Sequence, residues 1–75
     1  MKSRVIELQE KANKLLELAQ AMDYRVCNAE WLSDINKDFP ELSENWKSKA
    51  DTRKRASKRL WNAYLQILTE IKLEL

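Results

Sequence analysis

Apolar residues recur every three or four positions through the first half of the chain. They are Val5, Leu8, Ala12, Leu15, Ala19, Met22, Val26 and Ala29. Because an α-helix has 3.6 residues per turn, this spacing gathers them into one stripe that can stay buried against a neighbouring helix. Ser3, a residue type favoured as an N-cap, precedes the pattern. The pattern predicts a helix from about residue 3 to about residue 36.

The stripe drifts after Ala29, because Trp31, Leu32 and Ile35 turn away from it. Residues 23–28, DYRVCN, are also weak helix formers. Two alternatives follow. The first helix is either continuous, which we favour since neither Gly nor Pro interrupts it, or kinked or broken near residues 23–29, with Asn28 capping a second segment.

The segment INKDFPELS, residues 35–43, contains the only proline and predicts a turn at about residues 36–41. Asp38 and Glu41 have the spacing of a capping box, and Ser43 is a rival cap. A second helix is then expected from about residue 41 to about residue 74. Its apolar stripe comprises Leu42, Trp46, Ala50, Ser57, Leu60, Tyr64, Ile67, Ile71 and Leu75, widened by Trp61 and Leu68.

Two helices of similar length joined by a short turn form an antiparallel hairpin, in which residue i lies roughly opposite residue 76 − i. We therefore expect residues 1–75 to form one all-α domain. Each helix of a hairpin has only one neighbour, so a broad apolar surface near the C-terminus needs further cover. The prediction is self-association through Trp61, Leu65 and Leu68, giving a homodimeric four-helix bundle.

Composition excludes several classes of function. The 75 residues include no histidine, no glycine and a single cysteine. An internal disulfide is impossible, a zinc site lacks ligands, and no cofactor is expected. No histidine is present to activate Cys27, and no glycine-rich loop can hold a phosphate, so we expect a protein that is not an enzyme. Cys27, next to Val26, is expected to be a small buried apolar residue.

The chain also has no apolar run of about 18 residues, and its opening lacks the apolar core of a secretory signal. A lone cysteine agrees with a reducing compartment. These features predict a cytoplasmic protein without a membrane segment.

The net charge of +2 is unevenly distributed. Residues 1–42 hold six of the 14 basic and eight of the 12 acidic residues, leaving eight and four for residues 43–75. Five cations of the segment between Trp46 and Trp61 fan across about 140° opposite the apolar stripe. They are Lys47, Lys54, Arg55, Lys58 and Arg59. Such a fan is either a solvated outer surface or a contact for phosphates or an acidic partner, and no base-reading motif accompanies it.

Two further cations, Lys49 and Arg53, fall on the apolar stripe itself, where an unpaired charge is costly. Arg53 is expected opposite Asp23, so the two form an ion pair that sets the register, or the cations await an acidic partner.

The three tryptophans divide into two groups. Trp46 and Trp61 are predicted to lie in the core or a dimer interface. Trp31 leaves the stripe and is a candidate exposed anchor for a protein partner, the alternative being that it packs beneath Phe39. Acidic residues around the turn fit no calcium loop, which would need a glycine.

Together these features predict a small non-catalytic regulatory or adaptor protein that binds another protein. Chains of this kind are typical of inhibitors and assembly factors, including those of phages and plasmids. The alternative is a nucleic-acid-binding helical dimer that uses the basic surface of residues 47–59.

Overall fold

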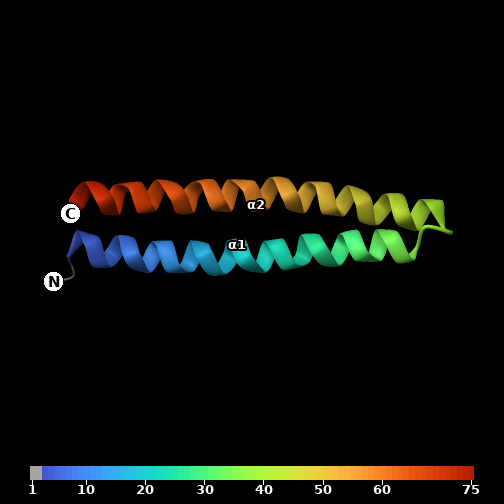
Figure 1. Cartoon of the computed structure of the whole chain (residues 1–75), viewed down its shortest axis with the longest axis horizontal. Coiled ribbons are helices and arrows are strands. Elements are labelled where there is room, and N and C mark those ends of the chain that lie inside the picture. The colour runs from blue at the N-terminus through green and yellow to red at the C-terminus, as the bar shows by residue number, and fades with distance from the viewer. Residues whose placement is uncertain (1–2) are drawn as a thin grey trace.

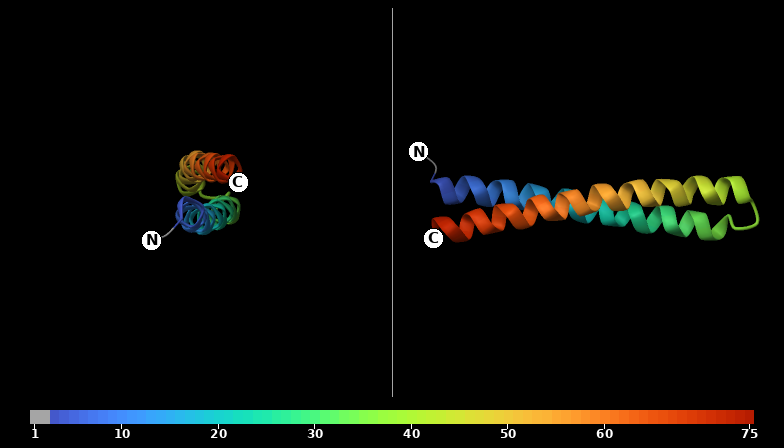
Figure 2. Two further views of the ribbon diagram at one scale, coloured as in Figure 1. Left: turned by 90° about the vertical axis from the view of Figure 1, so that its left-hand side faces the viewer. Right: turned by 90° about the horizontal axis from the view of Figure 1, so that it is seen from above.

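The computed structural model describes residues 3–75, which form two antiparallel helices joined by a short turn (Figure 1). Helix α1 spans Arg4–Ile35 and helix α2 spans Pro40–Glu74. The molecule measures 57 × 16 × 13 Å. The helices lie side by side along their whole length and cross at a shallow angle, with the start of α1 and the end of α2 at the end of the hairpin opposite the turn (Figure 2). The predicted all-α hairpin is confirmed.

Helix α1 runs without a break through residues 23–29, so the alternative of a helix broken there, with Asn28 as a cap, is wrong. Weak local propensity is overcome because Val26 and Ala29 are buried against α2. At the N-terminus the Ser3 hydroxyl accepts a hydrogen bond from the Ile6 amide at 3.2 Å, as expected of an N-cap. At the other end the Asn36 side-chain amide donates to the Leu32 carbonyl at 2.7 Å.

Helix α2 begins differently from the prediction. Phe39 is the N-cap residue, makes no side-chain capping bond, and is followed by Pro40 in the first turn. Proline suits this position because its φ is already helical and its missing N–H would have had no partner within the helix. The capping roles expected for Asp38 with Glu41, and for Ser43, are therefore wrong.

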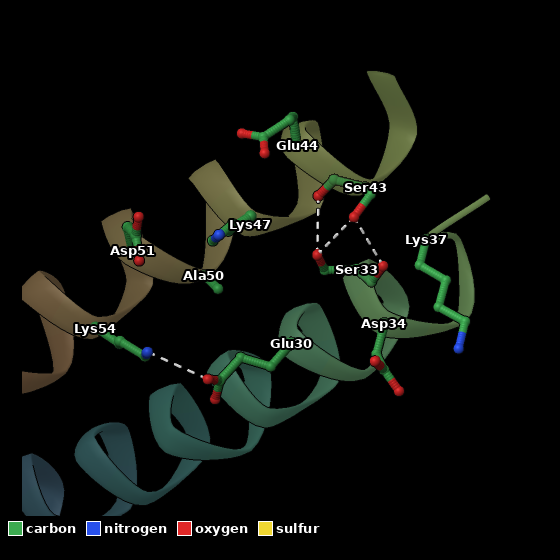
Figure 3. Close-up of a pocket in the computed structure, with 10 residues that line it drawn as sticks. All are labelled: Glu30, Ser33, Asp34, Lys37, Ser43, Glu44, Lys47, Ala50, Asp51 and Lys54. Atoms are coloured by element: carbon green, nitrogen blue, oxygen red, sulfur yellow. Dashed lines mark hydrogen bonds and ion pairs between the residues drawn. The ribbon is translucent and has the colours of Figure 1, made fainter. Parts of the chain in front are cut away.

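Ser43 instead joins the two helices just inside the turn (Figure 3). The Ser43 hydroxyl donates to the Ser33 carbonyl at 3.0 Å, and the Ser33 hydroxyl donates to the Ser43 carbonyl at 2.9 Å. Two polar side chains thus take the place that apolar residues hold elsewhere along the hairpin, and their bonds fix the register at this end.

The core is a thin line of small side chains between the helices. The buried residues are Leu8, Ala12, Ala19, Val26 and Ala29 of α1 with Ala50 and Ser57 of α2. All of them lie on the two stripes defined by the sequence, and Leu8 is the one large side chain that is fully buried. Leu42 and Leu75, assigned to the second stripe, are exposed because they lie near the ends of α2, where α1 offers little cover.

Over the residues that the structure describes, neither helix is both long enough and apolar enough to cross a membrane.

Candidate partner-binding surfaces

The hairpin is a flat plate with two broad faces, each made by both helices. The Trp61 face contains residues 9, 16, 23 and 30 of α1 and 47, 54, 61 and 68 of α2. The Lys49 face contains residues 11, 18, 25 and 32 of α1 and 42, 49, 56 and 63 of α2. Each set repeats every seven residues and lies beside the buried stripe, which places the two sets on opposite sides of it.

Asp23 connects the helices on the Trp61 face. Its carboxylate accepts hydrogen bonds from the Ser57 hydroxyl and from the Trp61 indole N–H, the latter at 2.9 Å. The Ser57 bond, followed by the Trp61 bond, lowers the pKa of Asp23 from 3.8, because both stabilise the charged form and outweigh desolvation. The Trp61 ring also packs edge-on against Tyr64, with 5.8 Å between centroids. Trp61 is therefore held in one orientation at the surface.

The ion pair predicted between Asp23 and Arg53 is wrong. Asp23 is engaged by Ser57 and Trp61, whereas an Arg53 guanidinium nitrogen donates to the backbone carbonyl of Arg25 at 3.0 Å. The physical reason is the direction of the two side chains: the register is the predicted one, as the Ser33–Ser43 bonds show, but Arg53 reaches toward the Lys49 face whereas Asp23 lies on the Trp61 face. Ser57, one helical turn beyond Arg53, is the residue that reaches Asp23.

The half of the Trp61 face nearest the chain ends is apolar and uncovered. Leu65 is 56% exposed and Leu68 39% exposed, next to the half-buried Leu16 and Trp61. Leu68 also lines a shallow groove between the helices, together with the uncharged side chains of Gln9 and Asn13. The residues predicted for self-association thus share one surface that their own chain leaves open.

The half of the same face nearest the turn is charged (Figure 3). The Lys54 ammonium lies 3.2 Å from a Glu30 carboxylate oxygen, and Lys47 lines the same cleft. Lys37 and acidic side chains from both helices also line it: Asp34, Glu44 and Asp51. The mixture of signs separates Lys47 and Lys54 from the other cations predicted to form one basic surface.

The remaining cations of that surface point away from α1. Arg55, Lys58 and Arg59 are all exposed. The Arg55 guanidinium donates to the Thr52 hydroxyl at 3.5 Å, a bond within α2. These three side chains are free to contact a phosphate or a carboxylate on another molecule.

The Lys49 face carries the cations that the sequence assigned to the apolar stripe. The Lys49 ammonium lies 4.4 Å from the centroid of the half-buried Trp46 ring, a cation–π contact. Arg53 is half-buried between the helices. Arg25, which the sequence analysis did not single out, is exposed beside Arg53. The sequence signal for Arg25 is its position seven residues after Leu18, which places both side chains on the same side of α1.

Trp31 lies on the outer ridge of α1, on the side away from α2. It is 59% exposed, and Phe39 is 61% exposed. Tyr24, seven residues before Trp31, extends this exposed ridge. Tyr24 is not identified from the sequence, because residues 23–28 are treated there as a possible break in the helix. Cys27 is also exposed, so its expected burial is wrong. One residue past Val26 the helix has turned by about 100°, which carries Cys27 out of the stripe.

Comparison with models of protein families, with curated proteins and with solved structures finds no match to this chain. Within residues 3–75, no cluster of three or more Cys, Asp or Glu side chains is arranged to hold a metal ion.

Proposed function

We propose that this protein is a non-catalytic, cytoplasmic adaptor or regulator that binds other proteins as a homodimer. The observation that carries the proposal is the uncovered apolar half of the Trp61 face, which contains Leu68 and is extended by the exposed Leu65, one turn after Trp61 on α2. Monomeric soluble proteins rarely leave a contiguous apolar patch of this kind open, and such a patch usually marks a binding surface.

The total surface supports a second copy as the cover. The chain exposes 5979 Å². A compact monomer of the same mass, 8.9 kDa, would expose about 4,800 Å². The difference of about 1,200 Å² per chain corresponds to about 2,400 Å² over the two chains of a dimer, which is within the range of obligate homodimer interfaces. An interface of that size would give each chain the exposed area expected of a compact protein of its mass.

Symmetry and charge also favour a second copy. A two-fold dimer places the same patch on both sides of the interface, so an apolar patch is complementary to itself. Pairing two hairpins through this patch gives each helix a second neighbour and yields a four-helix bundle. The one carboxylate at the edge of the apolar half, Asp23, is already bound by the Ser57 hydroxyl and the Trp61 indole N–H of its own chain.

Sedimentation equilibrium tests the dimer. We expect the wild-type chain to sediment as a dimer at about 0.1 mM, a concentration at which a micromolar complex is nearly saturated. Leu68→Asp should convert it to a monomer, because a charge would be buried in the interface. Leu73→Asp makes the same change at a more exposed leucine outside the Trp61 face, so it is the control and should remain dimeric. A wild-type monomer at this concentration would refute the proposal.

The exposure of Arg55, Lys58 and Arg59 favours nucleic-acid binding as a second candidate function. Phosphate contacts give an affinity that falls steeply with salt. Retention on heparin that is lost in Lys58→Ala and Arg59→Ala, but kept in Lys47→Ala, would support this candidate. Absence of retention at about 50 mM salt would reject it.

A further inference from the structure

We propose that the Lys49 face binds an acidic amphipathic helix of a partner protein. This inference rests on the proposed function, because it assumes that the module binds proteins, and it names the chemistry of the partner. It concerns the side of the hairpin opposite the dimer surface, so both contacts can exist together.

The Lys49 face has cations and no carboxylates over most of its length. Lys11, Arg25 and Lys49 occupy face positions, Arg53 lies beside them, and no Asp or Glu occupies any of the eight positions that define the face. Toward the chain ends the same heptad positions hold Arg4 and Glu70, which pair with each other at 3.6 Å. A surface of one sign attracts and orients a partner of the opposite sign.

Arg53 gives this charge a fixed direction. A guanidinium has five N–H donors, and the bond to the Arg25 carbonyl uses one nitrogen. The chain's own candidate acid, Asp23, is held on the Trp61 face by Ser57 and Trp61. A carboxylate from another molecule is therefore the complementary group for the open side of Arg53, which is already positioned by its half-buried stem.

The spacing of residues along α1 indicates a helix as the partner. Lys11, Leu18 and Arg25 follow one another at intervals of seven residues. Leu18 is 49% exposed, and the α2 positions beside it on this face are the alanines Ala56 and Ala63. Leu18 is therefore an apolar centre beside small side chains, which allow the backbone of another helix to approach closely. A cation lies about 10 Å from it in each direction along α1. The matching ligand is a helix with an acid, an apolar residue and an acid at seven-residue spacing.

Two other occupants are less well matched. A nucleic acid would use the cations but would leave Leu18 without an apolar partner. A second copy could offer Glu30, Asp34 and Glu44 from its Trp61 face, but such a contact joins unlike surfaces and would build open chains rather than a closed dimer.

The test uses the full chain and three fluorescent probes. The first is a helical peptide of about 21 residues, roughly 30 Å long, with Glu, Leu and Glu at seven-residue spacing. The second has Lys in place of both Glu residues, and the third is a mixed-sequence single-stranded RNA. Fluorescence anisotropy should show at least tenfold tighter binding of the acidic peptide than of the basic one.

Variants locate the contact. Lys49→Glu should weaken the acidic peptide at least tenfold and strengthen the basic peptide, and Leu18→Ser should weaken both. Lys58→Glu changes the net charge equally at an exposed position of α2 outside the Lys49 face and should have little effect. Circular dichroism of each variant verifies that the hairpin is retained.

Each adverse result overturns the inference. Equal binding of the two peptides, equal effects of Lys49→Glu and Lys58→Glu, or preference for RNA would exclude an acidic helix on this face. Polymers that disappear in Lys49→Glu would assign the face to other copies of the chain. If the chain sediments as a dimer but does not bind the acidic peptide, this inference is wrong and the proposed dimer stands. If the chain is a monomer that binds the peptide, the proposed dimer is wrong and this inference stands.

Discussion

Asp23 shows how one side chain can organise a hairpin that has almost no interior. Its carboxylate receives the Ser57 hydroxyl and the Trp61 indole N–H, so one group of α1 engages two successive turns of α2. A charged acceptor strengthens both bonds relative to neutral ones. Asp23 therefore fixes the pairing of the helices and also the orientation of the tryptophan beside the proposed dimer surface.

This arrangement predicts a defined pH dependence. The folded state lowers the pKa of Asp23 from 3.8, so near this pH the unfolded chain binds more protons than the folded one. The contribution of Asp23 to stability is therefore present above pH 3.8 and is lost as the pH falls through the lower folded value. Urea unfolding from neutral to acid pH should show a smaller acid loss in Asp23→Asn than in wild type.

Asp38→Asn is the matched control, because Asp38 is an exposed carboxylate at the turn. Its stability should follow the wild-type curve, because the substitution leaves the bonds of Asp23 to Ser57 and Trp61 intact. If Asp38→Asn and Asp23→Asn have the same pH profile, the bonds to Ser57 and Trp61 do not stabilise the charged form of Asp23.

At the scale of the element, α1 packs against α2 mainly through alanines. Ala12, Ala19 and Ala29 are buried where they face α2. Small side chains let two helix backbones approach closely, but each contributes little apolar area. Stability is therefore expected to fall when a larger side chain is placed on the side of α1 that faces α2, and to change little when it is placed on the exposed side.

Two substitutions of the same kind on α1 test this. Ala19→Leu places a large side chain between the helices and should lower the free energy of unfolding by about 1–3 kcal/mol. Ala21→Leu makes the same change at an exposed position and should stay within about 0.5 kcal/mol of wild type. Chemical denaturation of both variants measures the difference. Equal losses would mean that Ala19 is not packed against α2.

The same element shows how far periodicity predicts structure. The stripe from Val5 to Ala29 identified every buried residue of α1, because burial follows directly from the angle around the helix. Local propensity was the weaker guide at residues 23–28. It suggested a break where tertiary packing of Val26 keeps the helix intact.

At the scale of the whole molecule, the shape is far from that of a globular domain. The radius of gyration is 16.9 Å. A compact chain of this length would have a value of about 11 Å. A plate one helix thick leaves most of its larger apolar side chains partly open, Leu8 being the exception, and this geometry underlies the proposed dimer.

A dimer makes stability depend on concentration. If folding and association are coupled, a tenfold increase in protein concentration should raise the thermal midpoint by a few degrees, because mass action favours the associated state. Leu68→Asp should melt at a lower midpoint that does not change with concentration. Calorimetry over a range of concentrations measures both. A wild-type midpoint that is independent of concentration would indicate that the hairpin is stable alone.

Local sequence patterns predict the two helices, the stripes that face each other, the position of the turn and the register of the hairpin. Each follows from a local cause, namely the 3.6-residue period of apolar side chains or the fixed φ and missing N–H of Pro40. The sequence does not predict the contacts of individual side chains. It pairs Asp23 with Arg53, buries Cys27 and makes Ser43 a cap, and all three predictions are wrong.

The polar contacts between the helices come from the fold and not from the pattern. The register is the predicted one, since Ser33 and Ser43 bond opposite each other as 76 − i requires. Within that register Asp23 lies on the Trp61 face and bonds to Ser57, Arg53 reaches toward the Arg25 carbonyl on the Lys49 face, and Lys54 meets Glu30. Such pairings depend on where two distant segments meet, a relation that no local periodicity contains.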